Sequence, residues 1–102
     1  MEYQLVIQFH PTTGLDFDKL VSIEDALIDE LGDSASVDGH DIGSGEFNIF
    51  IFTDSPSGSF QRVQKLLQRV KPDGAMNVAY RDADGKGYVI LWPPNLAEFK
   101  VA

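Results

Sequence analysis

The chain contains no cysteine among its 102 residues. That absence excludes disulfide bonds, a thiolate nucleophile and cysteine-ligated zinc. Basic residues are also scarce, because eight Lys and Arg stand against sixteen Asp and Glu and give a formal net charge of −8. A nucleic-acid backbone is bound by Lys and Arg side chains that displace counterions, so we expect no nucleic-acid partner.

Long hydrophobic runs are missing as well. The longest, such as Ile49–Phe52, fall far short of the roughly 20 apolar residues that a membrane span needs. The first residues enter a strand pattern at once, without the basic region or cleavage site of a signal peptide. We therefore expect a cytoplasmic protein without a membrane partner, folded as a single α+β domain over residues 1–102 with a tail at 93–102.

Hydrophobic periodicity predicts two helices among several strands. Asp16 is a suitable N-cap and Gly32 a suitable stop for a helix over residues 17–31, whose apolar stripe Glu24 and Asp25 interrupt only on the flank. A second helix starts within 54–57 and is broken by Lys71–Gly74. The predicted strands are residues 3–9, 34–38, 46–53, 76–81 and 88–92.

This order of elements is typical of one fold. Each helix has one apolar stripe, so we expect both helices on the same face of an antiparallel sheet. The predicted fold is a ferredoxin-like βαββαβ plait with an extra C-terminal strand, in which the first and third strands are central neighbours. The acidic residues of the first helix and Arg62, Lys65 and Arg69 of the second favour pairing between the helices.

The sheet face opposite the helices is a candidate interaction face. If Leu5 and Ile7 point toward the helices, period-two alternation turns Val6, Phe50 and Phe52 the other way. An uncovered apolar patch of this kind usually marks a contact. Its covering could be the C-terminal tail or extra hairpin, a second copy of the chain, or a separate partner or ligand.

The segment from Asp38 to Glu46 holds the densest group of side chains able to do chemistry. His40 and the carboxylates of Asp38, Asp41 and Glu46 are possible metal ligands or an acid–base pair. Their spacing matches no established metal signature, however, and the interspersed glycines suit a structural or partner-contact loop. We therefore expect no confident metal site and no catalytic set, and we treat these four residues as a candidate recognition or ligand loop.

Two other glycine-containing motifs indicate turns. Gly43-Ser44-Gly45 leads into a strand, whereas phosphate-binding loops lead into a helix. Asp82-Ala83-Asp84-Gly85 resembles the start of a calcium loop, but Lys86 takes the next ligand position and a hairpin turn is the expectation. No cofactor is expected at either place.

Two parts of the chain carry a resemblance. The segment at residues 38–51, DGHDIGSGEFNIFI, and the ending from Tyr80-Arg81 through Asp84-Gly85 to Leu91-Trp92-Pro93 resemble a group of short uncharacterised bacterial proteins with no known activity. In size and acidity alone, the chain also resembles the small immunity proteins that neutralise bacterial toxins.

These observations support two hypotheses of function. The first is a non-enzymatic protein-interaction module, of an inhibitor or immunity type, with a basic protein partner and with self-association through the open sheet face as a further prospect. The alternative is a small metal- or ligand-binding domain, or an enzyme, that uses the Asp38–Glu46 loop.

Overall fold

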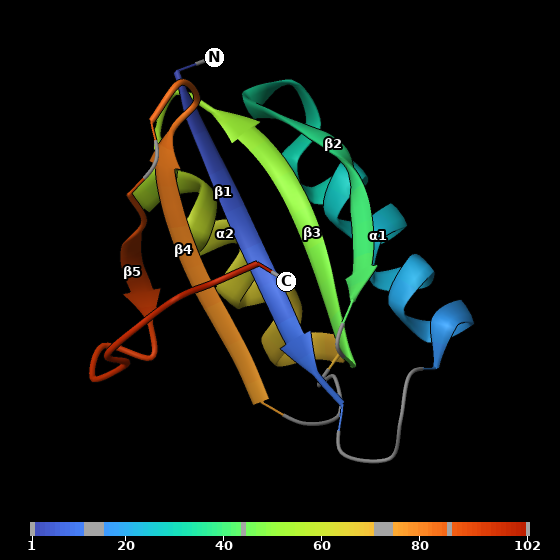
Figure 1. The fold of residues 1–102 in the computed structure, drawn as a ribbon. Helices are drawn as coiled ribbons and strands as arrows, with labels where there is room; N and C mark the ends of the chain where they lie inside the picture. The colour runs from blue at the N-terminus through green and yellow to red at the C-terminus, as the bar shows by residue number, and fades with distance from the viewer. Residues whose placement is uncertain (1, 12–15, 44, 71–74, 86, 102) are drawn as a thin grey trace.

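The computed structural model describes residues 2–11, 16–43, 45–70, 75–85 and 87–101. It is an α+β structure with two helices and a five-stranded antiparallel sheet, which confirms the predicted class at that level. The strand order is β2-β3-β1-β4-β5, and Figure 1 shows both helices behind the sheet on one face. The elements are β1 (Tyr3–His10), α1 (Phe17–Leu31), the short 3-10 helix η1 (Gly32–Ser34), β2 (Ala35–Gly43), β3 (Glu46–Thr53), α2 (Pro56–Val70), β4 (Ala75–Asp82) and β5 (Val89–Trp92).

Helix α1 has the bounds that its end signals predict. The side chain of Asp16 accepts a hydrogen bond from the Lys19 backbone N–H, which is the N-cap geometry. At the other end Gly32 adopts φ +53 and its N–H donates to the Ile28 carbonyl. This positive φ favours glycine over residues that carry a Cβ, so the helix ends there.

The buried face of α1 differs from the apolar stripe that helical spacing predicts, which consists of Phe17, Leu20, Val21, Leu27, Ile28 and Leu31. Ile23 and Glu24 are both buried, while Phe17 and Ile28 are about half exposed. Residues 20, 23, 24, 27 and 31 follow the i, i+3, i+4 spacing of one helix face, which puts Glu24 in the middle of that face. The expectation that Glu24 lies on the flank is therefore wrong, and a buried carboxylate needs a partner.

The main core lies between the helices and the sheet. Strand β1 is in the middle of the sheet and pairs with both β3 and β4, with Leu5 opposite Ile51 and Tyr80. Odd-numbered residues of β1 and β3 face the helices, as predicted from their alternation, and even-numbered residues of β4, such as Val78, face them too. The fully buried members of this core include Leu5, Ile7, Phe9, Leu27, Phe47, Ile49, Ile51, Val63 and Val78.

Strand β2 is longer than predicted. The sequence suggests a short strand at 34–38 followed by a loop, but residues 35–43 all belong to β2, and the register pairs all of them except Asp38 with β3. The register shifts between Val37 and Gly39, where Gly39 has φ +148, so a β-bulge absorbs the irregularity. Pairing with the strongly apolar β3 thus extends the strand through residues whose local preference is for turns.

The second half of the chain follows its predicted order. Helix α2 begins at Pro56, and the N–H of Gly85 donates to the Asp82 carbonyl at 2.8 Å in the expected turn after β4. The predicted helix break at 71–74 lies outside the described residues. Neither described helix is long and apolar enough to cross a membrane.

Helices α1 and α2 contact each other, and of the three basic residues predicted to pair across them, Arg69 is paired with a carboxylate of α1. Arg69 lies 3.4 Å from a Glu30 carboxylate oxygen, and Arg62 donates to the Glu30 backbone carbonyl at 3.3 Å. The Arg69 side chain is 62% exposed, so solvent screens this ion pair and its contribution to stability is small.

Candidate functional site

The four residues predicted as a recognition or ligand loop lie on a β-hairpin instead. Asp38, His40 and Asp41 belong to β2, and Glu46 is the first residue of β3. Side chains alternate along a strand, so His40 faces α1 while Asp41, opposite Asn48, belongs to the other face of the sheet. The structure therefore separates the four rather than gathering them, and among the described residues no three His, Cys, Asp or Glu side chains are placed to hold a metal ion.

His40 is held by a partner that the sequence did not reveal. Its Nδ1 lies 2.9 Å from the Glu24 carboxylate of α1, and because a carboxylate only accepts, Nδ1 donates the hydrogen. The imidazole stacks on Phe47 with ring centroids 4.9 Å apart, and the Phe17 ring meets its edge at 5.7 Å. His40 thus joins the outer strand to α1, and it supplies the partner that buried Glu24 needs.

Glu46 contacts His10, the other histidine of the chain. The Nδ1 of His10 lies 3.3 Å from one Glu46 carboxylate oxygen, and the amide of Gln8 donates to the other at 3.4 Å. The Nε2 of His10 lies 2.9 Å from the amide nitrogen of Asn77. We call this connected group, together with the neighbouring Asn48, the polar layer; its members are Gln8, His10, Glu46, Asn48 and Asn77.

Asn48 differs from the rest of the polar layer. It is fully buried, yet within the described residues neither its amide nitrogen nor its amide oxygen has a hydrogen-bond partner. It lies directly across from Gln8 in the pairing of β3 with β1. Buried amides in native proteins nearly always have partners, so this exception needs a functional or energetic explanation.

The predicted interaction face holds Val6, Phe50 and Phe52. Val6 is fully buried beneath a second, smaller cluster in which Phe99 and Ala79 pack against it. Phe50 is half-buried at the border of this cluster, and Phe52 is half-buried opposite Gln4. In the chain by itself, therefore, the C-terminal segment covers the middle of this face.

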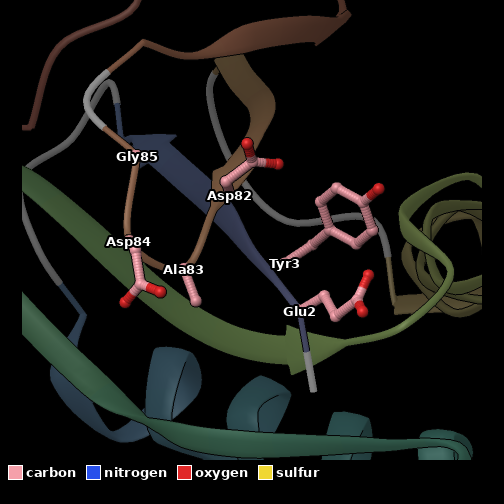
Figure 2. Close-up of a pocket in the computed structure, with 6 residues that line it drawn as sticks. All are labelled: Glu2, Tyr3, Asp82, Ala83, Asp84 and Gly85. Atoms are coloured by element: carbon pink, nitrogen blue, oxygen red, sulfur yellow. The ribbon is translucent and has the colours of Figure 1, made fainter.

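A hollow lies at the C-terminal end of β4. It has a volume of about 680 Å³ and is lined by Glu2, Tyr3, Asp82, Ala83, Asp84 and Gly85 (Figure 2). Figure 2 shows the carboxylates of Glu2 and Asp84 pointing away from each other, on opposite sides of Ala83. The acidic side chains do not converge on one point, so this hollow contributes negative charge without forming a cation cage.

The outer edge of β2 combines acidic and apolar side chains. Asp38 and Asp41 are exposed along the strand, and Ile42 beside them is 43% exposed. Phe17 of α1, also exposed, meets the same Phe47 that pairs with Ile42. We call these four residues the β2 edge. Because β2 is the terminal strand of the sheet, one side of its backbone has no neighbouring strand in the part of the chain that the structure describes.

Comparison of the chain with protein-family models, with curated proteins and with solved structures finds no match.

Proposed function

We propose that this chain is a small, non-enzymatic protein-interaction module that binds a basic protein partner at the β2 edge. The observation that carries the proposal is the terminal position of a nine-residue strand whose exposed residues include Asp38 and Asp41. An exposed strand edge can take up an extended segment of another protein, because its free N–H and C=O groups provide main-chain hydrogen bonds. Acidic side chains beside that edge select a segment rich in Lys and Arg.

The exposed apolar residues of the β2 edge support the same proposal. Phe17 and Ile42 are accompanied by the carboxylates of Asp38 and Asp41, and interface centres are commonly apolar with charged residues around them. A net charge of −8 adds long-range attraction that accelerates association with a basic partner. An inhibitor or immunity-type protein, acting in the cytoplasm, is the kind of interaction module that these properties fit.

The fold proposed for this module is the ferredoxin-like plait with one added strand. The order β2-β3-β1-β4 with two helices on one face supports it, and β5 is the addition.

The alternative, a metal- or ligand-binding site or enzyme in the Asp38–Glu46 segment, has less support. It requires His40 and the carboxylates to converge, whereas His40 is engaged by Glu24 and Glu46 by His10. We expect zinc, manganese and calcium to leave the melting temperature unchanged, since a specific site would raise it by mass action. A rise that His40→Ala abolishes would favour the alternative.

The proposed function is tested by affinity capture from the source cells with a matched pair of variants. Asp38→Asn/Asp41→Asn removes two carboxylates from the β2 edge, and Asp82→Asn/Asp84→Asn removes the same charge from the hollow. We expect a specific protein rich in Lys and Arg to be retained by the unaltered chain and by the hollow variant, and lost by the edge variant. Equal retention by all three chains would contradict the proposal.

A further inference from the structure

The C-terminal segment, residues 94–101, covers the sheet with few backbone contacts. Figure 1 shows it leaving β5 and crossing in front of β4 to β1. Within the described residues, its only backbone–backbone hydrogen bond is a local one from Leu96 to Pro93. The contacts that attach it to the sheet include the buried Phe99 ring, with Leu96 and Val101 packed against the same apolar cluster. In addition, the Gln8 side-chain amide donates a hydrogen bond to the Lys100 carbonyl at 2.7 Å.

The socket for Phe99 is built by the sheet and the last hairpin. Val6 and Ala79 form its floor, and the Tyr88 ring lies with its centroid 4.9 Å from that of Phe99. Gln8 is next along the same face of β1, so an aromatic ring and the following peptide carbonyl are recognised in order. A partner peptide of many different sequences could make both contacts, because they require only an aromatic side chain and a backbone peptide group.

Asn48 continues this row of recognition groups on the neighbouring strand. It is directly across from Gln8, and its amide offers an NH2 group that donates and a carbonyl oxygen that accepts. Those are the two groups that complement the C=O and N–H of a peptide backbone. Among the described residues, neither amide atom of Asn48 has a hydrogen-bond partner, so residues 94–101 fill the Phe99 socket without satisfying the Asn48 amide.

We propose that the sheet face from the Phe99 socket through Gln8 to Asn48 is a binding site for an extended peptide of a partner protein, which residues 94–101 occupy as an internal substitute. The partner peptide places an aromatic side chain in the socket, gives a backbone carbonyl to Gln8 and pairs its next peptide group with Asn48. It displaces the internal segment because it satisfies an amide that the segment leaves unpaired. This inference rests on the proposed role in protein interaction and concerns a different surface from the β2 edge.

The test uses the full chain and synthetic peptides. The probe is a fluorescent peptide with the sequence of residues 94–101, extended by two glycines; a matched probe replaces its phenylalanine by alanine. The protein variant Phe99→Ala frees the socket. We expect this variant to bind the phenylalanine probe at least about tenfold more tightly than the unaltered chain does, because the internal segment no longer competes, and to bind the alanine probe far more weakly.

Asn48→Leu in the Phe99→Ala background tests the row of amides. The two added glycines should tighten binding several-fold when Asn48 is present and have no effect when leucine replaces it. A folded Phe99→Ala chain that binds the phenylalanine probe no better than the unaltered chain would overturn the proposal. If the two glycines tighten binding equally with asparagine and with leucine at position 48, the assignment of the peptide path past Asn48 is overturned.

A second measurement remains decisive if Phe99→Ala destabilises the fold. The chain has no cysteine, so Val101→Cys accepts one spin label on the internal segment. We expect an excess of the phenylalanine probe, and not the alanine probe, to increase the mobility of the label. An unchanged spectrum at saturating probe would count against displacement. A dimer of the unaltered chain that Phe99→Ala dissociates would assign the face to a second copy and likewise overturn the proposal.

The test is independent of the charge-based one. Its variants leave Asp38 and Asp41 in place, so a failed peptide assay leaves capture at the β2 edge unaffected.

Discussion

The two faces of the sheet are covered by different means. On one face, helices α1 and α2 bury a continuous apolar core, and the buried hydroxyls of Thr53 and Ser59 hydrogen-bond to each other at 2.7 Å. On the other face, an extended segment packs on a small apolar cluster and contacts the polar layer at Gln8; within the described residues, the Asn48 amide of that layer has no hydrogen-bond partner. The helix face thus has the complete packing of a structural core. The face covered by residues 94–101 combines burial with an unsatisfied amide, which is the combination expected where a partner peptide replaces the chain's own segment.

The largest effect is expected on the helix face. Leu27 is fully buried in α1, and Leu27→Ala should lower the free energy of unfolding by about 2–5 kcal/mol through lost contacts and a residual cavity. Urea unfolding followed by circular dichroism measures the change. Ile28→Ala, on the exposed side of the same helix, is the control and should cost under ~0.5 kcal/mol. Similar losses for both would show that α1 does not bury the face assigned to it.

Phe99→Ala should have a smaller effect. Burial of one phenylalanine side chain is worth about 1.5–3 kcal/mol, and the segment that carries Phe99 can relax after truncation. The same urea experiment applies, with the exposed Glu98→Ala as control. If Phe99→Ala costs as much as Leu27→Ala, the two faces form one cooperative core and the contrast between them fails.

Asn48→Leu should raise the free energy of unfolding by about 1 kcal/mol. A buried amide without partners opposes folding, and an apolar side chain of similar size removes that opposition. Ser59→Ala provides the opposite case, because it removes a satisfied hydroxyl and should lower stability by about 1 kcal/mol. Thermal unfolding of the two variants side by side tests the sign; destabilisation by Asn48→Leu would mean that the amide has a partner in solution.

The smallest effect belongs to the helix-to-helix ion pair. Arg69→Gln should lower stability by only ~0.2–1 kcal/mol, and the difference should shrink at high salt because Arg69 is largely exposed. Urea unfolding of the variant and the unaltered chain at low and high salt provides the measurement. A loss that is large and independent of salt would show that packing of the Arg69 stem, rather than its charge, connects the helices.

Local signals account for much of the predicted fold. The bounds of α1 follow from Asp16 and Gly32, because a capping side chain and a glycine at positive φ act over only a few residues. The faces of β1 follow from strict alternation. These features depend on neighbours in sequence, and sequence reasoning reaches them.

The candidate site depended on distant neighbours, and its prediction was less successful. Gly39 and Gly43 indicate a loop locally, but pairing with β3 holds both in a strand. The partnership of His40 with Glu24 joins residues 16 positions apart, and only the assembled helix and sheet bring them together. Burial of Glu24 was readable in principle from the spacing of Leu20, Leu27 and Leu31, although a carboxylate there argued against it.

The two edges of the sheet are unequal, and this has a consequence for stoichiometry. β2 contributes nine residues at one edge, whereas β5 contributes only four at the other. A strand added at β2 finds no equally long edge on the opposite side from which the sheet could continue to grow. Repeated head-to-tail addition, which produces open filaments, is therefore disfavoured. The complex expected from strand addition is finite, with one partner segment to one copy of the chain.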